Sequence, residues 1–318
     1  MSTIPDVTSN KLPILLYQIT TKFRDEVKPR CGLLRAREFL MKDLYSFDKS
    51  LFDAKITYNN ICSTYDRIFE NLNIPYLKVV GETGDMGGIL SHEYHIPSDI
   101  GEDTLAVCEE CNNASNSKLY QSDFCCVCNN KMKLVRSIEV GHTFLLGKRY
   151  SAPLQATFKN TDNSVVPLVM GSYGLGLTRI LAACVEVLSP KENIKWPLLI
   201  APYSVVIITP KAGSHGAYSC GDLGNQIYSR LNCMQHLSED VLLDDRDNLT
   251  IGKRVWHARR TGYPYLIVIG EKATLQPPTV ELLDVAHDSV KYLSYPDLIQ
   301  FFNEHFDSLD QNISYQIS

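Results

Sequence analysis

Residues 21–48 read "TKFRDEVKPRCGLLRAREFLMKDLYSFD". Residues 24–37 of this stretch contain five basic side chains: Arg24, Lys28, Arg30, Arg35 and Arg37. Pro29 and Gly32 interrupt it, which predicts a strand, a turn and a returning strand. Glu26 and Glu38 offset only part of the positive charge, so we expect these arginines to bind an external anion. The structural alternative is a charged, solvated edge hairpin.

Side chains alternate between the two faces of a strand. In the returning strand, this alternation places Arg35, Arg37 and Phe39 on one face, and Met41 and Asp43 continue it. The planar guanidinium group is suited to the oxygens of phosphate and carboxylate. One face of this strand therefore offers a phosphate ligand, an aromatic ring and an acid in sequence.

The chain has 318 residues, which favours two domains, and its composition is that of a soluble globular protein. Residues 1–196 contain 22 basic and 22 acidic side chains, whereas residues 197–318 contain 9 and 14 and carry the net charge of −5. Nucleic-acid binding would therefore need local basic clusters. The longest apolar run, residues 196–210, is short and is broken by Pro197 and Pro202, so we expect no membrane partner.

A second glycine-rich stretch, "GSYGLGLTRIL", covers residues 171–181. Its glycines let the backbone approach a ligand closely, and a helix over residues 177–189 follows at once. Arg179 lies in the first turn of that helix, where a cation opposes the helix dipole. This position indicates that Arg179 serves a group outside the helix.

Other patterns complete the expected elements. Helical spacing over residues 50–74 predicts a helix, and strands are expected at 76–80, 90–96, 137–147, 154–160 and 165–176. From residue 197, strands at 204–210, 241–245, 265–270 and 279–284 enclose helices at 217–232 and 249–262. This alternation predicts a second, α/β unit.

The spacing Cys108-x2-Cys111-x13-Cys125-x2-Cys128 is that of a four-thiolate zinc site. The chain has ten cysteines and no secretory segment after Met1, which favours reduced thiols over disulfides. Free thiols on a loop are the alternative, and Cys126 could compete as a ligand.

The helix expected at 249–262 carries Lys253, His257 and Arg260 on one face, with Arg246 before it and Trp256 within it. Basic and aromatic side chains together can bind phosphates and stack on bases. A solvated helical face explains the same spacing equally well.

Six stretches together resemble class II aminoacyl-tRNA synthetases, and closely the prolyl-tRNA synthetases of bacterial and mitochondrial type. They are "FRDEVKPRCGLLRAREFLMKD" (motif 2), "GDMGGILSHEYHI", "IEVGHTFLLGKRYS", "MGSYGLGLTRIL" (motif 3), "WPLLIAPY" and "VLLDDRDNLTIGKR". The resemblance implies an α+β catalytic domain at 1–196, with an antiparallel sheet flanked by helices and a cysteine-rich insertion at 97–136. An α/β anticodon-binding domain would occupy residues 197–318.

The family roles, carried over residue by residue, imply a proline–tRNA ligase that uses ATP and Mg²⁺, with a structural Zn²⁺ at the cysteines. Arg24 and Arg179 would be catalytic. The ATP-binding residues would be Arg24, Glu26, Arg35, Phe39, Glu139 and Arg179. The proline-binding residues would be Met41, Asp43, His142, Phe144, Gly171 and Ser172, and for His142 a structural role is an equal alternative. Arg246, Lys253 and Arg254 would contact the anticodon of proline tRNA.

The resemblance also implies a homodimer in the mitochondrial matrix. Ser172 replaces a cysteine common in the family, and the match begins after motif 1 and the Thr-x-Glu stretch, so we expect a form without that amino-terminal part. The alternatives are a threonyl, glycyl or histidyl relative, or a non-catalytic synthetase-like protein that binds tRNA.

Overall fold

The expected hairpin is formed by strands β1 (Ile14–Phe23) and β2 (Glu38–Asp48), which pair in antiparallel register. The computed structural model describes residues 7–119 and 122–315, with side chains up to residue 306. These residues fall into two compact units, one of residues up to 70 with 74–187 and one of residues 71–73 with 188 onward. Each unit is described separately below.

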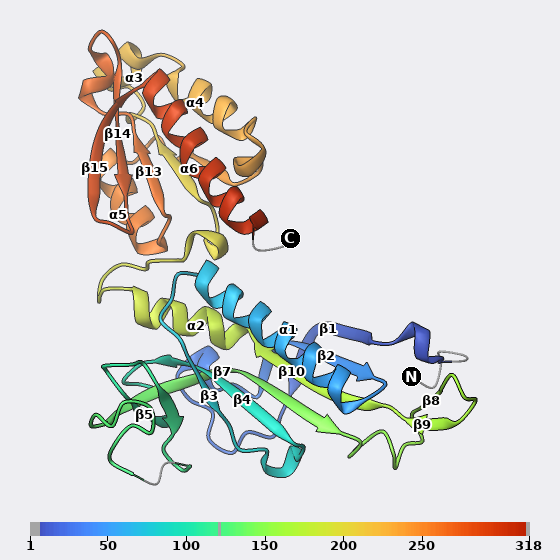
Figure 1. Cartoon of the computed structure of the whole chain (residues 1–318). Helices are drawn as coiled ribbons and strands as arrows, with labels where there is room; N and C mark the ends of the chain where they lie inside the picture. The colour runs from blue at the N-terminus through green and yellow to red at the C-terminus, as the bar shows by residue number, and fades with distance from the viewer. Residues whose placement is uncertain (1–6, 120–121, 316–318) are drawn as a thin grey trace. The chain divides into compact units, whose positions relative to one another are not determined.

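The first unit is built on an antiparallel sheet with the strand order β1-β2-β10-β7-β4-β3 (Figure 1). Its further strands are β3 (Leu77–Val80), β4 (Leu90–Pro97), β7 (Lys133–Gly147) and β10 (Val169–Gly176). Strand β5 (Asp103–Val107) pairs with β7 and with β6 (Ala114–Asn116). Strands β8 (Thr157–Lys159) and β9 (Val165–Pro167) form a separate hairpin.

Helix α1 (Leu51–Asn71) covers one face of this sheet. Its aromatic side chains pack on tyrosines of the central strands, with ring centroids 5.5 Å apart for Tyr65 and Tyr94 and 5.8 Å apart for Tyr58 and Tyr173. All four rings are nearly fully buried. Side chains alternate between the two faces of a strand. The side chains of the central strands that do not point toward α1 therefore lie on the opposite face of the sheet. Helix α2 (Leu177–Leu188) follows β10, as the glycine-rich stretch predicts.

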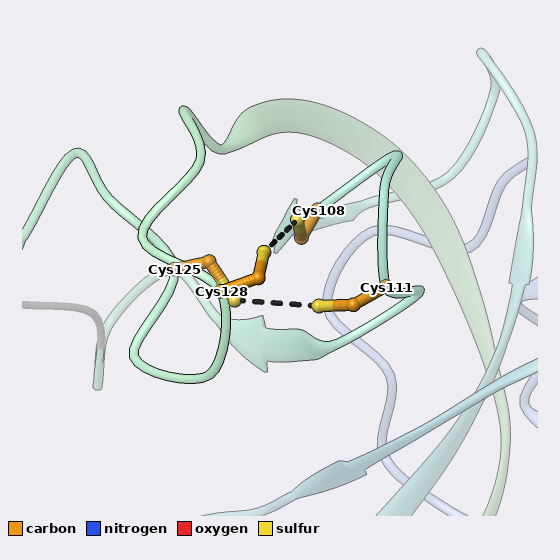
Figure 2. Close-up of side chains that lie close together, drawn as sticks. All are labelled: Cys108, Cys111, Cys125 and Cys128. Atoms are coloured by element: carbon orange, nitrogen blue, oxygen red, sulfur yellow. Dashed lines mark hydrogen bonds between the residues drawn. The ribbon is translucent and has the colours of Figure 1, made fainter.

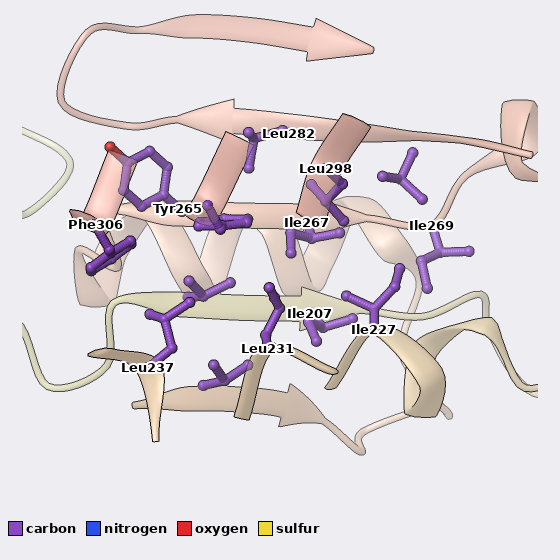
Figure 3. Close-up of a cluster of buried hydrophobic side chains, with 14 of the residues drawn as sticks. Ile207, Ile227, Leu231, Leu237, Tyr265, Ile267, Ile269, Leu282, Leu298 and Phe306 are labelled. Atoms are coloured by element: carbon purple, nitrogen blue, oxygen red, sulfur yellow. The ribbon is translucent and has the colours of Figure 1, made fainter. Parts of the chain in front are cut away.

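The second unit contains a five-stranded mixed sheet in the order β12-β11-β13-β14-β15. Strands β11 (Val205–Ile208), β12 (Val241–Asp244) and β13 (Tyr265–Val268) are parallel, and β14 (Thr279–Asp284) and β15 (Ser289–Ser294) extend it antiparallel. Helices α4 (Leu223–Asn232) and α6 (Tyr295–Tyr315) supply side chains to the larger core, shown in Figure 3. Helix α5 (Ile251–Thr261) packs on a second apolar cluster.

Several elements differ from expectation, and strands β5 and β6 lie in a segment for which no strand was predicted. The helix predicted at 217–232 is divided into α3 (His215–Cys220) and α4, because Gly221 has φ +52°. Helix α6 and strand β15 were not anticipated. Their apolar side chains, such as Leu298 and Phe302, bury completely only against the sheet of the second unit.

Candidate functional site

A cavity of about 460 Å³ opens on the face of the first sheet that lies opposite α1. Side chains from β2, β7 and β10, from the turn between β1 and β2, and from the start of α2 line it. The basic residues among them are Arg24, Arg35 and Arg179. Both arginine-bearing segments singled out in the sequence therefore contribute to one cavity.

Strand register explains how separate stretches meet on the cavity floor. Asp43 on β2 lies opposite Gly174 on β10, which lies opposite His142 on β7. In the next row, Ser172 lies opposite Phe144. The cavity brings together five of the six residues expected to bind proline: Met41, Asp43, His142, Phe144 and Ser172.

Gly171 departs from this group. It lies on the α1 side of β10, where an added Cβ would be 2.1 Å from the hydroxyl oxygen of Tyr173, and it does not line the cavity. The structure therefore does not place Gly171 with the other five residues expected to bind proline. Gly174 takes this place, since a Cβ there would lie 2.7 Å from Cε of Met41. Alternation places Gly174 on the same face of β10 as Ser172, and the structure shows that this face meets the cavity.

Asp43 is the acidic group of the cavity floor and is only 9% exposed. Lys22 on β1 forms a salt bridge with it at 2.5 Å, and the Nε2 of Gln18 donates a hydrogen bond to it at 3.3 Å. Both partners come from the edge strand. These contacts hold the carboxylate in place while one side of it faces the cavity.

His142 is fixed on three sides. Its Nδ1 lies 3.0 Å from Oε1 of Glu139, its Nε2 lies 2.7 Å from Oγ of Ser91, and its ring stacks on Phe144 at 3.9 Å. Burial raises the pKa of Glu139, but the hydrogen bond from His142 and the charges of His142 and His95 together outweigh this effect, and the pKa lies below its ordinary value. The ring thus forms a cavity wall with both nitrogens already engaged.

Arg24 and Arg179 are held in place by different contacts. The guanidinium carbon of Arg24 lies 5.0 Å from the centre of the Phe39 ring. Arg179 donates from Nε to the carbonyl oxygen of Leu34 and from Nη1 to that of Glu139, each at 2.8 Å. Arg179 therefore ties the start of α2 to the β1–β2 turn and to β7. The helix-dipole argument had indicated such an outside contact.

Arg37 does not line the cavity, in contrast to the expected shared face with Arg35 and Phe39. Strand β2 begins only at Glu38, so strict alternation does not extend back to these arginines. The Nε of Arg37 instead donates to the carbonyl oxygen of Glu26 at 3.0 Å.

The carboxyl groups of Glu26 and Glu102 both contact Arg35. Arg35 lies 2.9 Å from Oε1 of Glu26, and this hydrogen bond lowers the pKa of the Glu26 carboxyl group. Glu102 binds Arg35 through one oxygen and Arg30 through the other. Glu102 was missed in the sequence because it is 67 residues from Arg35 and belongs to no motif.

The four cysteines singled out by spacing converge (Figure 2). Their sulfur atoms all lie within 4.8 Å of one another, with Cys108 and Cys128 at 3.3 Å and Cys111 and Cys125 at 3.5 Å. Cys126 is exposed and is not part of the group, so it does not act as a fifth member.

Each cysteine pair begins a C-x-x-C-N-N sequence, at residues 108–113 and 125–130, and the two turns are alike. The N–H groups of Asn112 and Asn129 donate to the carbonyl oxygens of Cys108 and Cys125, both at 2.9 Å, and both asparagines have positive φ. Backbone N–H groups of Cys128 and Val127 lower the pKa of the Cys125 thiol to about 6. At Cys125, the thiolate form that metals bind is thereby favoured.

In the second unit, helix α5 exposes Lys253, Trp256 and Arg260. The guanidinium carbon of Arg260 lies 4.8 Å from the centre of the Trp256 ring, and Trp256 is 53% exposed. Arg246 is bound to the carboxylate of Asp244 through two nitrogens and remains exposed. These side chains form an accessible basic and aromatic surface.

Arg254, in contrast, is completely buried. Its guanidinium group donates to the carbonyl oxygens of Asp244 and Thr209, which link the ends of two strands. The interpretation of Arg254 as an anticodon contact is therefore corrected to a structural role.

Replacing Arg254 with alanine is expected to destabilise the second unit by about 2–4 kcal/mol, since it leaves a cavity and unpaired carbonyl oxygens. Denaturant unfolding measures this change. The matched control is Lys253→Ala on the exposed face of α5, which we expect to change stability by less than about 0.5 kcal/mol. An Arg254→Ala protein as stable as the Lys253→Ala protein would contradict the structural role.

None of the helices in the described parts of the chain is both long enough and apolar enough to cross a membrane.

Comparison with protein families identifies both units. Residues 4–188 match the tRNA synthetase class II core domain (G, H, P, S and T), and residues 204–305 match the anticodon binding domain.

Similar proteins carry consistent names. A protein of Rattus norvegicus named "Probable proline--tRNA ligase, mitochondrial" is 43% identical over 287 residues, which cover 89% of this chain and 60% of the relative. The proline–tRNA ligase of Ehrlichia canis is 36% identical, over 94% of this chain and 72% of the relative. The chain thus spans about 60% of the length of the rat and human mitochondrial relatives.

Solved structures share the fold. The prolyl-tRNA synthetase of Cryptosporidium parvum, complexed with L-proline and AMP, has a TM-score of 0.73 at 17% identity, covering 98% of this chain and 59% of that one. The enzyme of Giardia lamblia, in complex with prolyl-adenylate, has a TM-score of 0.74 at 19% identity, covering 92% and 52%. The chain belongs to the class II aminoacyl-tRNA synthetases, and within them to the prolyl-tRNA synthetase family.

Proposed function

We propose that this chain activates proline with ATP and transfers it to proline tRNA. The observation that carries the proposal is the shared cavity, in which Arg24, Arg35 and Arg179 lie around a floor that includes Asp43 and Phe144. An enzyme of this kind must hold a polyanion and a small amino acid side by side. The names of the relatives agree with this reading.

In the first step, a carboxylate oxygen of proline attacks the α-phosphorus of ATP, and pyrophosphate leaves. Arg24 would neutralise charge on the carboxylate and the α-phosphate, while Arg35 and Arg179 would bind the β- and γ-phosphates. Glu26 would accept a hydrogen bond from the adenine amino group, and the adenine ring would stack on Phe39. Glu139 fits as a carboxylate partner for Mg²⁺, which would neutralise phosphate charge when bound.

The amino-acid subsite would lie over the paired strands β2, β10 and β7. Met41 covers Gly174, and Phe144 and His142 form a stacked wall, so the space suits a small apolar ring. Asp43 would face the secondary ammonium group of proline. In the second step, a terminal ribose hydroxyl of the tRNA attacks the carbonyl carbon of prolyl-adenylate, and AMP leaves.

The test is amino-acid-dependent ATP–pyrophosphate exchange with the 318-residue chain. We expect exchange with proline and none with threonine, glycine, histidine or serine, the other substrates of enzymes that share this core domain. Exchange that depends on one of those four amino acids would overturn the substrate assignment. Absence of exchange, together with tRNA binding, would instead indicate a non-catalytic protein.

The second unit would bind the anticodon of proline tRNA through Arg246 and Lys253, with Trp256 available for stacking on a base. Both basic side chains are exposed on an otherwise acidic unit. A double variant, Arg246→Ala with Lys253→Ala, should weaken tRNA binding and leave proline-dependent exchange unchanged.

We infer that the cysteine group binds a structural Zn²⁺. Four sulfur ligands at about 2.3 Å from zinc lie about 3.8 Å from one another, and the sulfur separations here fit such a site. A bound ion would stabilise the polar segment at residues 97–136, which has few apolar side chains of its own. Elemental analysis should find one zinc per chain, and folded, reduced protein without zinc would contradict the inference.

We infer further that the protein forms a homodimer through β1. This edge strand exposes Leu15, Tyr17, Ile19 and Phe23 to 49–73%. Among the described residues β1 pairs only with β2, so its other edge can pair with a second copy. Sedimentation equilibrium should give a dimer that Tyr17→Arg with Ile19→Arg converts to a monomer.

Because the similar proteins of rat, human and fission yeast are named mitochondrial, we propose a location in the mitochondrial matrix. Fractionation of cells that express the gene tests this assignment.

A further inference from the structure

Glu102 is an acidic residue beside the nucleotide cavity to which the proposed mechanism gives no role. Its two carboxylate oxygens are divided between two arginines, Oε1 to Nε of Arg30 and Oε2 to Nη1 of Arg35. Arg35 uses its other terminal nitrogen for Glu26, at 2.9 Å. A small adjoining hollow is lined by Glu102 together with Arg30, Arg35 and Arg179, so the carboxylate lies at the arginine-rich end of the site.

The backbone on the Glu102 side is anchored to the sheet. The carbonyl oxygen of Gly101 accepts two hydrogen bonds from Arg136, at 3.0 Å and 2.6 Å. A Cβ at position 101 would lie 2.2 Å from the backbone of Ser137, so this segment is packed closely on β7. Strand β5, which begins at the next residue after Glu102, pairs with the same strand.

Arg30 and Arg35, the partners of Glu102, lie in the turn between β1 and β2. Cys31 and Gly32 both have positive φ, and the side chains of Arg30 and Arg35 are 53% and 37% exposed. The backbones of Arg30 and Arg35 form an isolated antiparallel β-bridge, and their side chains form ion pairs with Glu102 and, for Arg35, also with Glu26. The arginines can therefore turn toward another anion while Glu102 stays in place.

We propose that Glu102 is a specificity-determining residue that competes with the ATP phosphates for Arg30 and Arg35. Without nucleotide, its carboxylate occupies these two guanidinium groups. A nucleoside triphosphate displaces it because the β- and γ-phosphates carry more negative charge than one carboxylate. When pyrophosphate forms, Glu102 takes back the arginines and favours release of that product. This inference rests on the proposed ATP-binding function.

The competition has a selective consequence. A nucleoside monophosphate places its single phosphate at Arg24 and has no group that needs Arg30 or Arg35, so it binds without displacing Glu102. The competing carboxylate weakens the binding only of ligands that have a β-phosphate. Removal of the Glu102 charge should therefore strengthen binding of ATP and pyrophosphate and leave AMP unaffected.

The test is calorimetric titration of the 318-residue protein with Mg²⁺–ATP, AMP and inorganic pyrophosphate. In the Glu102→Gln variant, we expect the Kd for Mg²⁺–ATP and for pyrophosphate to fall about two- to fivefold, the range that exposed ion pairs contribute. The Kd for AMP should not change. Glu102→Asp keeps the charge and should remain within about twofold of the wild type for all three ligands.

Glu109→Gln is the matched control. Glu109 lies in the same segment and pairs with Lys133 at 2.8 Å, on the exposed surface and away from the hairpin. The Glu109→Gln protein should bind Mg²⁺–ATP, AMP and pyrophosphate with the same Kd values as the wild type.

Weaker ATP binding in Glu102→Gln, or an unchanged ratio of ATP to AMP affinity, would overturn the inference and leave the proposed function intact. A wild-type protein that binds neither ATP nor AMP would overturn the proposed function, and the inference with it.

Discussion

Replacement of Arg24 by alanine is expected to lower the rate of proline-dependent ATP–pyrophosphate exchange by about 10²- to 10³-fold, as found when one charge-stabilising donor is removed from an active site. Arg24 directly follows β1, lies over Phe39, and has its Nη2 3.8 Å from Sδ of Met41. It therefore stands between the expected nucleotide and amino-acid subsites, where charge develops as the carboxylate attacks phosphorus.

Arg24→Lys should recover only part of the rate, because a lysine keeps the charge and loses the planar fork that contacts two anionic groups together. Arg67→Ala serves as the control, since Arg67 is a surface residue of α1 that donates to Thr64 of the same helix. The exchange rate is measured at saturating ATP and proline. An Arg24→Ala protein within threefold of the wild type would refute the role of Arg24.

The second large effect is expected at the cysteine group. Cys125→Ser should reduce bound zinc from about one ion per chain to nearly none, since serine is a poor ligand for a thiolate site. Cys125 is one of the two buried members of the group, and its turn is held by the N–H of Asn129. Without the ion, the segment at residues 97–136 should become rapidly cleaved in limited proteolysis.

Cys126→Ser is the matched control, because Cys126 is adjacent in sequence, exposed, and outside the sulfur group. It should keep its zinc and its resistance to protease. Equal zinc content in the two variants, whether high or low, would contradict a site built from Cys108, Cys111, Cys125 and Cys128.

Much of the site was predictable because the relevant signals are local. Five closely spaced basic residues indicate an anion, the turn residues indicate a hairpin, and alternation selects Met41 and Asp43 as neighbours on one face. The C-x-x-C spacing places two sulfur atoms in one turn, whichever structure surrounds them.

Errors arose where a local rule stopped applying. Alternation fails for Arg37 because β2 begins one residue later. Gly171 belongs to a glycine-rich stretch, but the pleat turns it toward α1, and only the packing of Tyr173 decides which parity faces the cavity. Arg254 was assigned to the anticodon through the family resemblance, which does not specify burial, yet it is buried and donates to carbonyl oxygens at two strand ends.

The amino-acid sequence by itself determined the hairpin, the helices and strands of strong periodicity, the cysteine pairs and the family resemblance, because each depends on residues close together in the chain. Only the tertiary structure decided that Glu102 faces Arg35, that Asp43, Gly174 and His142 form one row, and that Arg254 is internal. These facts depend on strand register and on which face the helices cover, and both are set by the burial of apolar surface over the whole unit.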